Sequence, residues 1–208
     1  MPPDNGKPVR TKRREISPSP IATPDEFFAL SGREFQGIIS DIRAAKDDGS
    51  RPVPSASLMD RSALLTPAKR AALLDHVASL VDENLAGRSE MCIQFAQLIH
   101  LALSHLGMNS EAVVGIAIYF SDSGEEIFRW NHAWARVGSE VIDGNTDSMD
   151  ESITVPDVVQ APPYWGPIKG IPGRRLRGYG PPPDDTDVDN EWWPRLREWL
   201  DTEFRNIP

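Results

Sequence analysis

Residues 89–108, S-E-M-C-I-Q-F-A-Q-L-I-H-L-A-L-S-H-L-G-M, decide how this chain folds, because they combine a helical pattern with the only cysteine. Ser89 can cap a helix that runs to about Leu106, and Gly107 is a residue type that often ends one. The apolar residues follow in steps of three and four and so share one helix face: Cys92, Phe95, Ala96, Ile99, Ala102, Leu103 and Leu106. The pattern predicts an amphipathic helix with Cys92 in its first turn, on the inward face.

The place of Cys92 in this helix favours a reactive thiolate. The first turn of a helix has unpaired backbone N–H groups and the positive end of the helix dipole. Both stabilise the thiolate, which is the nucleophilic form of cysteine, and the N–H groups can also donate to an oxyanion on an attacked carbonyl. A small buried apolar residue is the alternative interpretation, and the cysteine taken alone favours it.

Beyond the helix, the sequence changes to the alternation that is typical of β-strands. Residues 111–120 and 127–137 are rich in branched and aromatic side chains, and residues 140–145 form a third such segment. A turn at 121–124 and a tight turn at 138–139 separate the three segments. One helix followed by an antiparallel meander predicts an α+β fold, with the cysteine helix packed on an antiparallel sheet.

The tight turn determines how the second and third strands pair. A two-residue turn at 138–139 sets His132 opposite Asn145. Because side chains alternate with a period of two, one face then carries four polar or aromatic residues: His132, Trp134, Asp143 and Asn145. On that face, His132 and Asp143 are diagonal neighbours within side-chain reach.

These positions predict a nucleophile, a base and an orienting carboxylate. A carboxylate that holds one nitrogen of an imidazole leaves the other nitrogen free to act on a thiol. Each residue also has a plainer interpretation: His132 can be a structural histidine with a backbone partner, and Asp143 a turn residue before Gly144. Their joint placement behind Cys92 favours the catalytic interpretation.

The helix, the strand N-H-A-W-A-R-V (131–137) and the segment V-I-D-G-N (141–145) together resemble the transglutaminase-like superfamily of cysteine enzymes. The resemblance covers about residues 87–147. It implies a papain-like core, in which a helix carries the cysteine and adjacent strands carry the histidine and the aspartate. It also implies three roles, those of nucleophile, of base and acid, and of orienting group, for Cys92, His132 and Asp143.

The segment around Asp143 departs from the pattern of this family. Its members usually have an aromatic residue shortly before the aspartate and often a proline after it, whereas this chain has Ile142 and Gly144 there. Asn145 and Asp147 therefore stay open as the orienting residue. A second donor to the oxyanion also stays open, with three candidates in the sequence: Asn84, Arg88 and Trp134.

The resemblance implies attack by a thiolate on an amide or ester carbonyl, with a thioester acyl-enzyme as the intermediate. We therefore expect a thiol-dependent amide hydrolase, a peptidase or a deamidase, that acts on a peptide or protein. Acyl transfer to an amine acceptor, as in crosslinking, is the alternative within the family. A catalytically idle protein-binding module of the same fold is the alternative outside enzymes. Hydrolysis is favoured because the sequence shows no accessory domain that would present an amine.

Three tryptophans are candidates for substrate contacts. Trp130 and Trp134 can wall a narrow cleft beside the histidine, and Trp165 can form its rim, although packing in the core is the alternative for each. Residues 162–178 are predicted to form a long ordered loop. Its arginines, Arg174, Arg175 and Arg177, can recognise a carboxylate, but a solvated loop is the favoured interpretation.

The chain divides into three predicted parts. Residues 1–22 are basic and rich in proline, which predicts a disordered arm. Residues 23–180 form the predicted catalytic domain, in which Thr-Pro pairs at 23–24 and 66–67 start extra N-terminal helices. Residues 181–208 are predicted to be an acidic linker followed by a C-terminal helix that docks through its aromatic residues.

The composition excludes several other classes of protein. The 208 residues carry a net charge of -9, which argues against nucleic-acid binding, since that depends on neutralising phosphates. One cysteine excludes an internal disulfide and a multi-cysteine zinc site. No apolar run approaches the roughly 18 residues of a membrane span. We expect no metal, cofactor or membrane partner and a cytoplasmic location, with secretion without a cleaved signal as the alternative. The oligomeric state stays open.

Overall fold

The computed structural model describes residues 37, 40, 44–45, 49–83, 88, 91–151, 155–156, 159 and 161–208. These residues fall in one unit that runs from Gly37 to Pro208. The predicted arm of residues 1–22 and the predicted helix start at 23–24 lie outside the described residues. Among the helices that the structure describes, none is both long and apolar enough to cross a bilayer.

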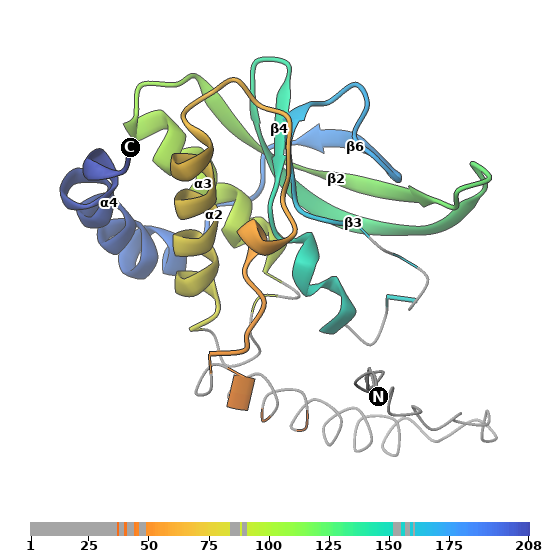
Figure 1. The fold of residues 1–208 in the computed structure, drawn as a ribbon, viewed down its shortest axis with the longest axis horizontal. Helices are drawn as coiled ribbons and strands as arrows, with labels where there is room; N and C mark the ends of the chain where they lie inside the picture. The colour runs from red at the N-terminus through yellow and green to blue at the C-terminus, as the bar shows by residue number, and fades with distance from the viewer. Residues whose placement is uncertain are drawn as a thin grey trace, which may run out of the picture. The chain divides into compact units, whose positions relative to one another are not determined.

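Helices pack beside a six-stranded sheet in the described part of the chain (Figure 1). The helices are α2 (Pro67–Val81), α3 (Cys92–His105) and α4 (Trp193–Thr202), with short helical turns η1 (Pro54–Ala56), η2 (Thr146–Glu151), η3 (Val188–Trp192) and η4 (Phe204–Asn206). The strands are β1 (Met59–Asp60), β2 (Ser110–Phe120), β3 (Glu126–Val137), β4 (Glu140–Asp143), β5 (Tyr164–Pro167) and β6 (Arg174–Gly180). The predicted α+β class is confirmed.

The sheet is mixed, with the strand order β1-β5-β4-β3-β2-β6. β1 runs parallel to β5, and all other neighbouring strands are antiparallel. The prediction of an antiparallel arrangement is therefore correct for the three strands that the sequence predicts, but the sheet as a whole is mixed. The parallel pair arises because the chain before α2 adds a short edge strand beside β5.

The prediction of a loop over residues 162–178 is wrong, because β5 and most of β6 lie in this segment. β5 has only four residues. β6 lies at an edge of the sheet, where many of its side chains face solvent, such as Tyr179 at 63% exposure. An exposed edge strand needs few apolar residues, so its sequence is close to that of a basic loop.

The hairpin of β3 and β4 has the register that the tight turn predicts. Val137 lies opposite Glu140, and Ala135 lies opposite Ile142. Gly138 in the turn has a φ of 58°, which glycine adopts without the strain that a side chain causes. This register brings the strand positions of His132 and Asp143 near each other.

Small side chains on the sheet let α3 pack closely against it. Ala96 of α3 forms a buried cluster with Ala112 of β2 and Ala133 of β3. Trp134, the next residue of β3, belongs to another buried cluster, together with Val113, Val141 and Tyr164. Ala133 and Trp134 belong to different clusters because neighbouring side chains of a strand point to opposite faces of the sheet. The alanines lie on the face that α3 covers, so they set the distance between helix and sheet.

The main core lies among the three helices and also includes Ala135, Ile142 and Trp165 from the sheet. The C-terminal segment packs on this core, which contains its buried residues Val188, Trp192, Leu196, Leu200 and Phe204. His76 of α2 stacks on Trp199 of α4, with ring centroids 4.0 Å apart. Residues 188–204 thus share one core with α2 and α3.

Gly115 of β2 offers a test of how closely β2 and β6 approach. A Cβ at Gly115 would overlap the backbone carbonyl of Arg177. Because backbone atoms cannot rotate away, we expect Gly115→Ala to lower the free energy of unfolding by about 1–3 kcal/mol, measured by urea denaturation.

Gly180→Ala is the matched control. It changes another glycine of the same strand pair, but a Cβ there meets no atom within 4 Å. We expect a change within about 0.5 kcal/mol. Equal stability of the two variants would contradict the close approach at Gly115.

Candidate active site

His132 of β3 and Asp143 at the end of β4 form a buried pair across the hairpin. The Nε2 atom of His132 lies 2.7 Å from Oδ1 of Asp143, and the two residues are 5% and 1% exposed. The predicted diagonal contact across the hairpin is therefore present. Because Nε2 faces the carboxylate, Nδ1 is the ring nitrogen left to act on another group.

Arg174, the first residue of β6, binds the other oxygen of the same carboxylate. Its Nε donates to Oδ2 of Asp143 at 2.7 Å, and the side chains of both residues are 0% exposed. One terminal nitrogen donates to the carbonyl of Pro162 at 3.1 Å, while Nη1 is buried without a partner in the described structure. A solvated loop was the favoured prediction for this arginine, and its complete burial contradicts that prediction.

Burial opposes charge on Asp143 and His132, yet their neighbours hold both in the charged form. Burial alone raises the pKa of Asp143, but the charge of Arg174 and then that of His132 lower this pKa to about 2. Burial alone lowers the pKa of His132, but the charge of Asp143 and hydrogen bonds to Asp143 and Cys92 raise it to about 10. The arrangement therefore favours an imidazolium beside a carboxylate at neutral pH.

Cys92, the first residue of α3, supplies a thiol next to this pair. It is a free, partly buried cysteine that packs against the alanine cluster between α3 and the sheet. Its side chain raises the pKa of His132 both by a hydrogen bond and by charge. The thiol of Cys92 and the carboxylate of Asp143 therefore both act on the imidazole of His132.

Aromatic residues surround the polar groups. The rings of Trp130 and Trp134 lie on either side of the His132 ring, with centroids 6.4 Å and 6.3 Å away. Tyr119 of β2 is buried and donates to Sδ of Met149 at 3.3 Å. Burial, followed by the charge of Asp143, raises the pKa of Tyr119, so this hydroxyl stays neutral.

The three predicted substrate-contact tryptophans have different surroundings. Trp130 is partly buried, and Trp134 is buried at 2% exposure with an Nε1 atom that has no partner in the described structure. Trp165 is 0% exposed and belongs to the helix-side core. Trp130 and Trp134 therefore flank the histidine, whereas Trp165 has no surface that a substrate could touch in this structure.

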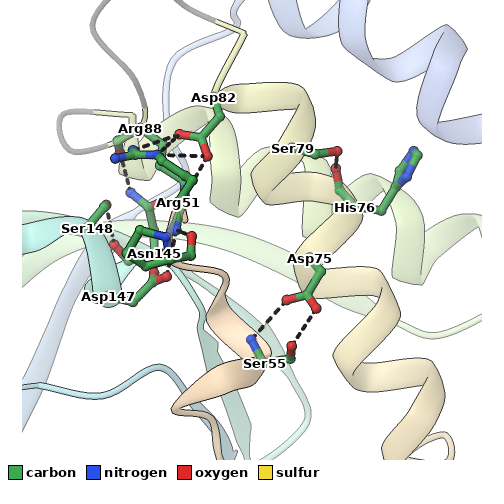
Figure 2. A network of polar contacts seen from close by, with 11 residues as sticks. Arg51, Ser55, Asp75, His76, Ser79, Asp82, Arg88, Asn145, Asp147 and Ser148 are labelled. Carbon is green, nitrogen blue, oxygen red and sulfur yellow. Dashed lines mark hydrogen bonds and ion pairs between the residues drawn. The ribbon is translucent and has the colours of Figure 1, made fainter. Parts of the chain in front are cut away.

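A second buried polar network lies around Arg88 (Figure 2). Arg88 is 0% exposed, and its guanidinium contacts Asp147 at 2.6 Å and Asp82 at 3.3 Å. Arg51 adds a contact to Asp82 at 2.9 Å. Two buried carboxylates are thus paired with two arginines, which is the condition under which such groups can be buried.

This network also connects the two chain segments that lead to the site. The backbone carbonyl of Arg88 accepts a hydrogen bond from Nδ2 of Asn145 at 2.7 Å. Arg88 lies shortly before Cys92 in the chain, and Asn145 lies shortly after Asp143. The network therefore holds the start of the cysteine helix beside the end of the aspartate strand.

The same contacts separate the three candidates for the orienting residue. Asp143 contacts His132, whereas Asn145 donates to the carbonyl of Arg88 and Asp147 pairs with its guanidinium. The guanidinium of Arg88 is thereby occupied, while the unpartnered Nε1 of Trp134 remains a candidate oxyanion donor. The third candidate donor, Asn84, lies outside the described residues.

A hollow in the surface adjoins the site at Arg174. Its lining combines cationic and apolar residues and contains no acidic residue: Phe120, Ser121, Ile168, Lys169, Gly170, Ile171, Gly173, Arg174, Arg175 and Leu176. Among the described residues, no group of three or more His, Cys, Asp or Glu is placed to hold a metal ion.

Comparison of the chain with protein-family models, with curated proteins and with solved structures found no match.

The histidines give a direct test of the electrostatics. We expect NMR titration to show His132 still protonated at pH 8, because Asp143 raises its pKa to about 10. His76 and His100 are internal controls, and their titration midpoints should lie below pH 6.5, since burial lowers the pKa of each. The His132→Gln variant assigns the signal. A His132 midpoint at or below 6.5 would contradict the charged pair.

The same proton makes stability depend on pH. The pKa of His132 is higher in the folded than in the unfolded chain, so its stabilising contribution is complete below about pH 6.5 and is lost as the pH rises to about 10. We expect His132→Gln to flatten the fall in the free energy of unfolding over this range, measured by urea denaturation. His100→Gln is the control: burial lowers the pKa of His100, so this residue is already neutral over this range and its loss should leave the slope unchanged.

Proposed function

We propose that this protein is a thiol-dependent amide hydrolase of the transglutaminase-like type, acting on a peptide or protein. The observation that carries the proposal is the buried hydrogen bond between His132 and Asp143, with the thiol of Cys92 at the same imidazole. A buried charged pair is costly unless it is well compensated, and here it lies beside the only cysteine. This combination supports a catalytic role over a purely structural one.

In the proposed reaction, the thiolate of Cys92 attacks the amide carbonyl and forms a C–S bond. The carbonyl π electrons move onto oxygen, and in this proposal the N–H groups with which α3 begins stabilise the oxyanion, since the first N–H groups of an α-helix have no partner within the helix. The imidazolium of His132 then gives its proton to the amide nitrogen as the C–N bond breaks. The products of this half-reaction are a free amine and a thioester on Cys92.

The second half-reaction releases the acyl group. Neutral His132 takes a proton from water, the hydroxide adds to the thioester carbonyl, and the C–S bond breaks to give a carboxylic acid and the thiolate. Asp143 keeps the ring oriented and compensates the charge of the imidazolium in both halves. We propose water as the acceptor, and transfer to an amine is the alternative that mass spectrometry of the products separates from it.

A peptidyl vinyl sulfone tests the nucleophile and the base together. In its reaction, the thiolate adds to the vinyl carbon and the imidazolium protonates the neighbouring carbon. We expect the probe to label Cys92, Cys92→Ala to abolish labelling, and His132→Gln to slow it by about 10²-fold or more. His100→Gln, which changes a histidine on the same helix as Cys92, should be labelled at the wild-type rate. Labelling of the His132→Gln variant at the wild-type rate would contradict the proposal.

Mass spectrometry of peptides incubated with the protein identifies the reaction. A cleaved bond indicates a peptidase, a gain of about one dalton a glutamine deamidase, and an amine adduct acyl transfer. We expect cleavage or deamidation, and expect Cys92→Ala to show neither. Full turnover by Cys92→Ala would refute the proposal, and slow alkylation of Cys92 by iodoacetamide with the pH dependence of a free thiol would support an idle binding module instead.

A further inference from the structure

Arg174 occupies a position that orienting Asp143 alone would not require. Asp143 already has one oxygen on His132, and its second oxygen could be satisfied by a neutral donor. Instead, the chain buries a complete guanidinium there, at 0% side-chain exposure and 2.7 Å from Oδ2. Burying a second full charge is costly, which calls for an explanation beyond the filling of a hydrogen bond.

We propose that Arg174 is a positioning residue of the reaction, which locks the Asp143 carboxylate and limits how strongly that carboxylate holds the proton of His132. This inference rests on the proposed function, because it concerns the proton that His132 transfers.

The locking follows from how Arg174 is itself held. A terminal nitrogen of its guanidinium is tied to the carbonyl of Pro162, and its backbone is paired with Tyr119 of β2. The carboxylate therefore receives one fixed donor on each oxygen, Nε of Arg174 on Oδ2 and Nε2 of His132 on Oδ1. It cannot rotate without breaking one of these contacts, and the plane of the imidazole is fixed with it.

The limit on proton affinity follows from the charges that face the site. α3 contributes Cys92, β3 His132, β4 Asp143 and β6 Arg174, while Tyr119 of β2 stays neutral. In the thiolate–imidazolium state, these charges sum to zero. Without Arg174 the sum would be −1, and the carboxylate would hold the imidazole proton more tightly. A proton held too tightly is given up slowly to a leaving amine.

The test compares Arg174→Met with Arg174→Lys. Removing the positive charge should raise the NMR titration midpoint of His132 by about one pH unit, and Arg174→Lys should move it by less than half of that. The rate of labelling of Cys92 by the peptidyl vinyl sulfone at neutral pH should fall about tenfold or more in Arg174→Met. If Arg174→Met does not fold, Arg174→Gln, which is also uncharged, serves in its place.

Arg70→Lys is the matched control, since Arg70 is an equally buried arginine whose carboxylate partner is Asp60 and not Asp143. It should lower stability towards urea but leave the His132 midpoint and the labelling rate of the folded protein unchanged. A merely structural Arg174 would behave in the same way, so an unmoved or lowered midpoint in Arg174→Met overturns the inference.

The outcomes also separate this inference from the proposed function. If Cys92→Ala is inactive while Arg174→Met keeps the wild-type midpoint and rate, only the role of Arg174 fails. If Cys92→Ala keeps full turnover, the proposed function fails, and the role of Arg174 in the reaction fails with it, whatever the midpoint.

Discussion

The charge on Asp143 is the constraint on which the site depends. A carboxylate that is 1% exposed remains ionised only if both of its oxygens are compensated. Here His132 of β3 and Arg174 of β6 provide that compensation, so one side chain of β4 connects three strands of the sheet. In the Arg88 network, buried carboxylates are likewise compensated by arginines. This network holds the chain before α3 against the chain after β4.

The cysteine helix and the hairpin contact between His132 and Asp143 can be predicted from the sequence, because both depend on residues that are close together in the chain. The helix of Cys92 follows from the spacing of its apolar residues, and the contact of His132 with Asp143 follows from a two-residue turn and strict alternation. The latter pair is only 11 residues apart, within one hairpin. The sequence leaves Asp143 and Asn145 open as partners of His132, because the contact that occupies Asn145 comes from Arg88, 57 residues away in the chain.

The remaining features depend on partners that are distant in sequence. Nothing near Arg174 distinguishes it from Arg175 or Arg177, and only the register of β6 on β2 places it beside Asp143, 31 residues away. The burial of Trp165 likewise results from the position of β5 beneath the helices. The alternation of Arg174 and Leu176 with the exposed Arg175 and Arg177 is a usable signal for a strand, but three arginines in four residues concealed it.

The late position of β6 has a consequence for synthesis on the ribosome. The cysteine helix and the β3–β4 hairpin are translated first, and the arginine that balances Asp143 follows only after β5. A nascent chain that ends before β6 would have to bury Asp143 with His132 as its only cationic partner at this site. The pairing of β6 with β2 therefore supplies the last charge of this cluster, so that chains translated only as far as β5 lack the electrostatic balance of the folded domain.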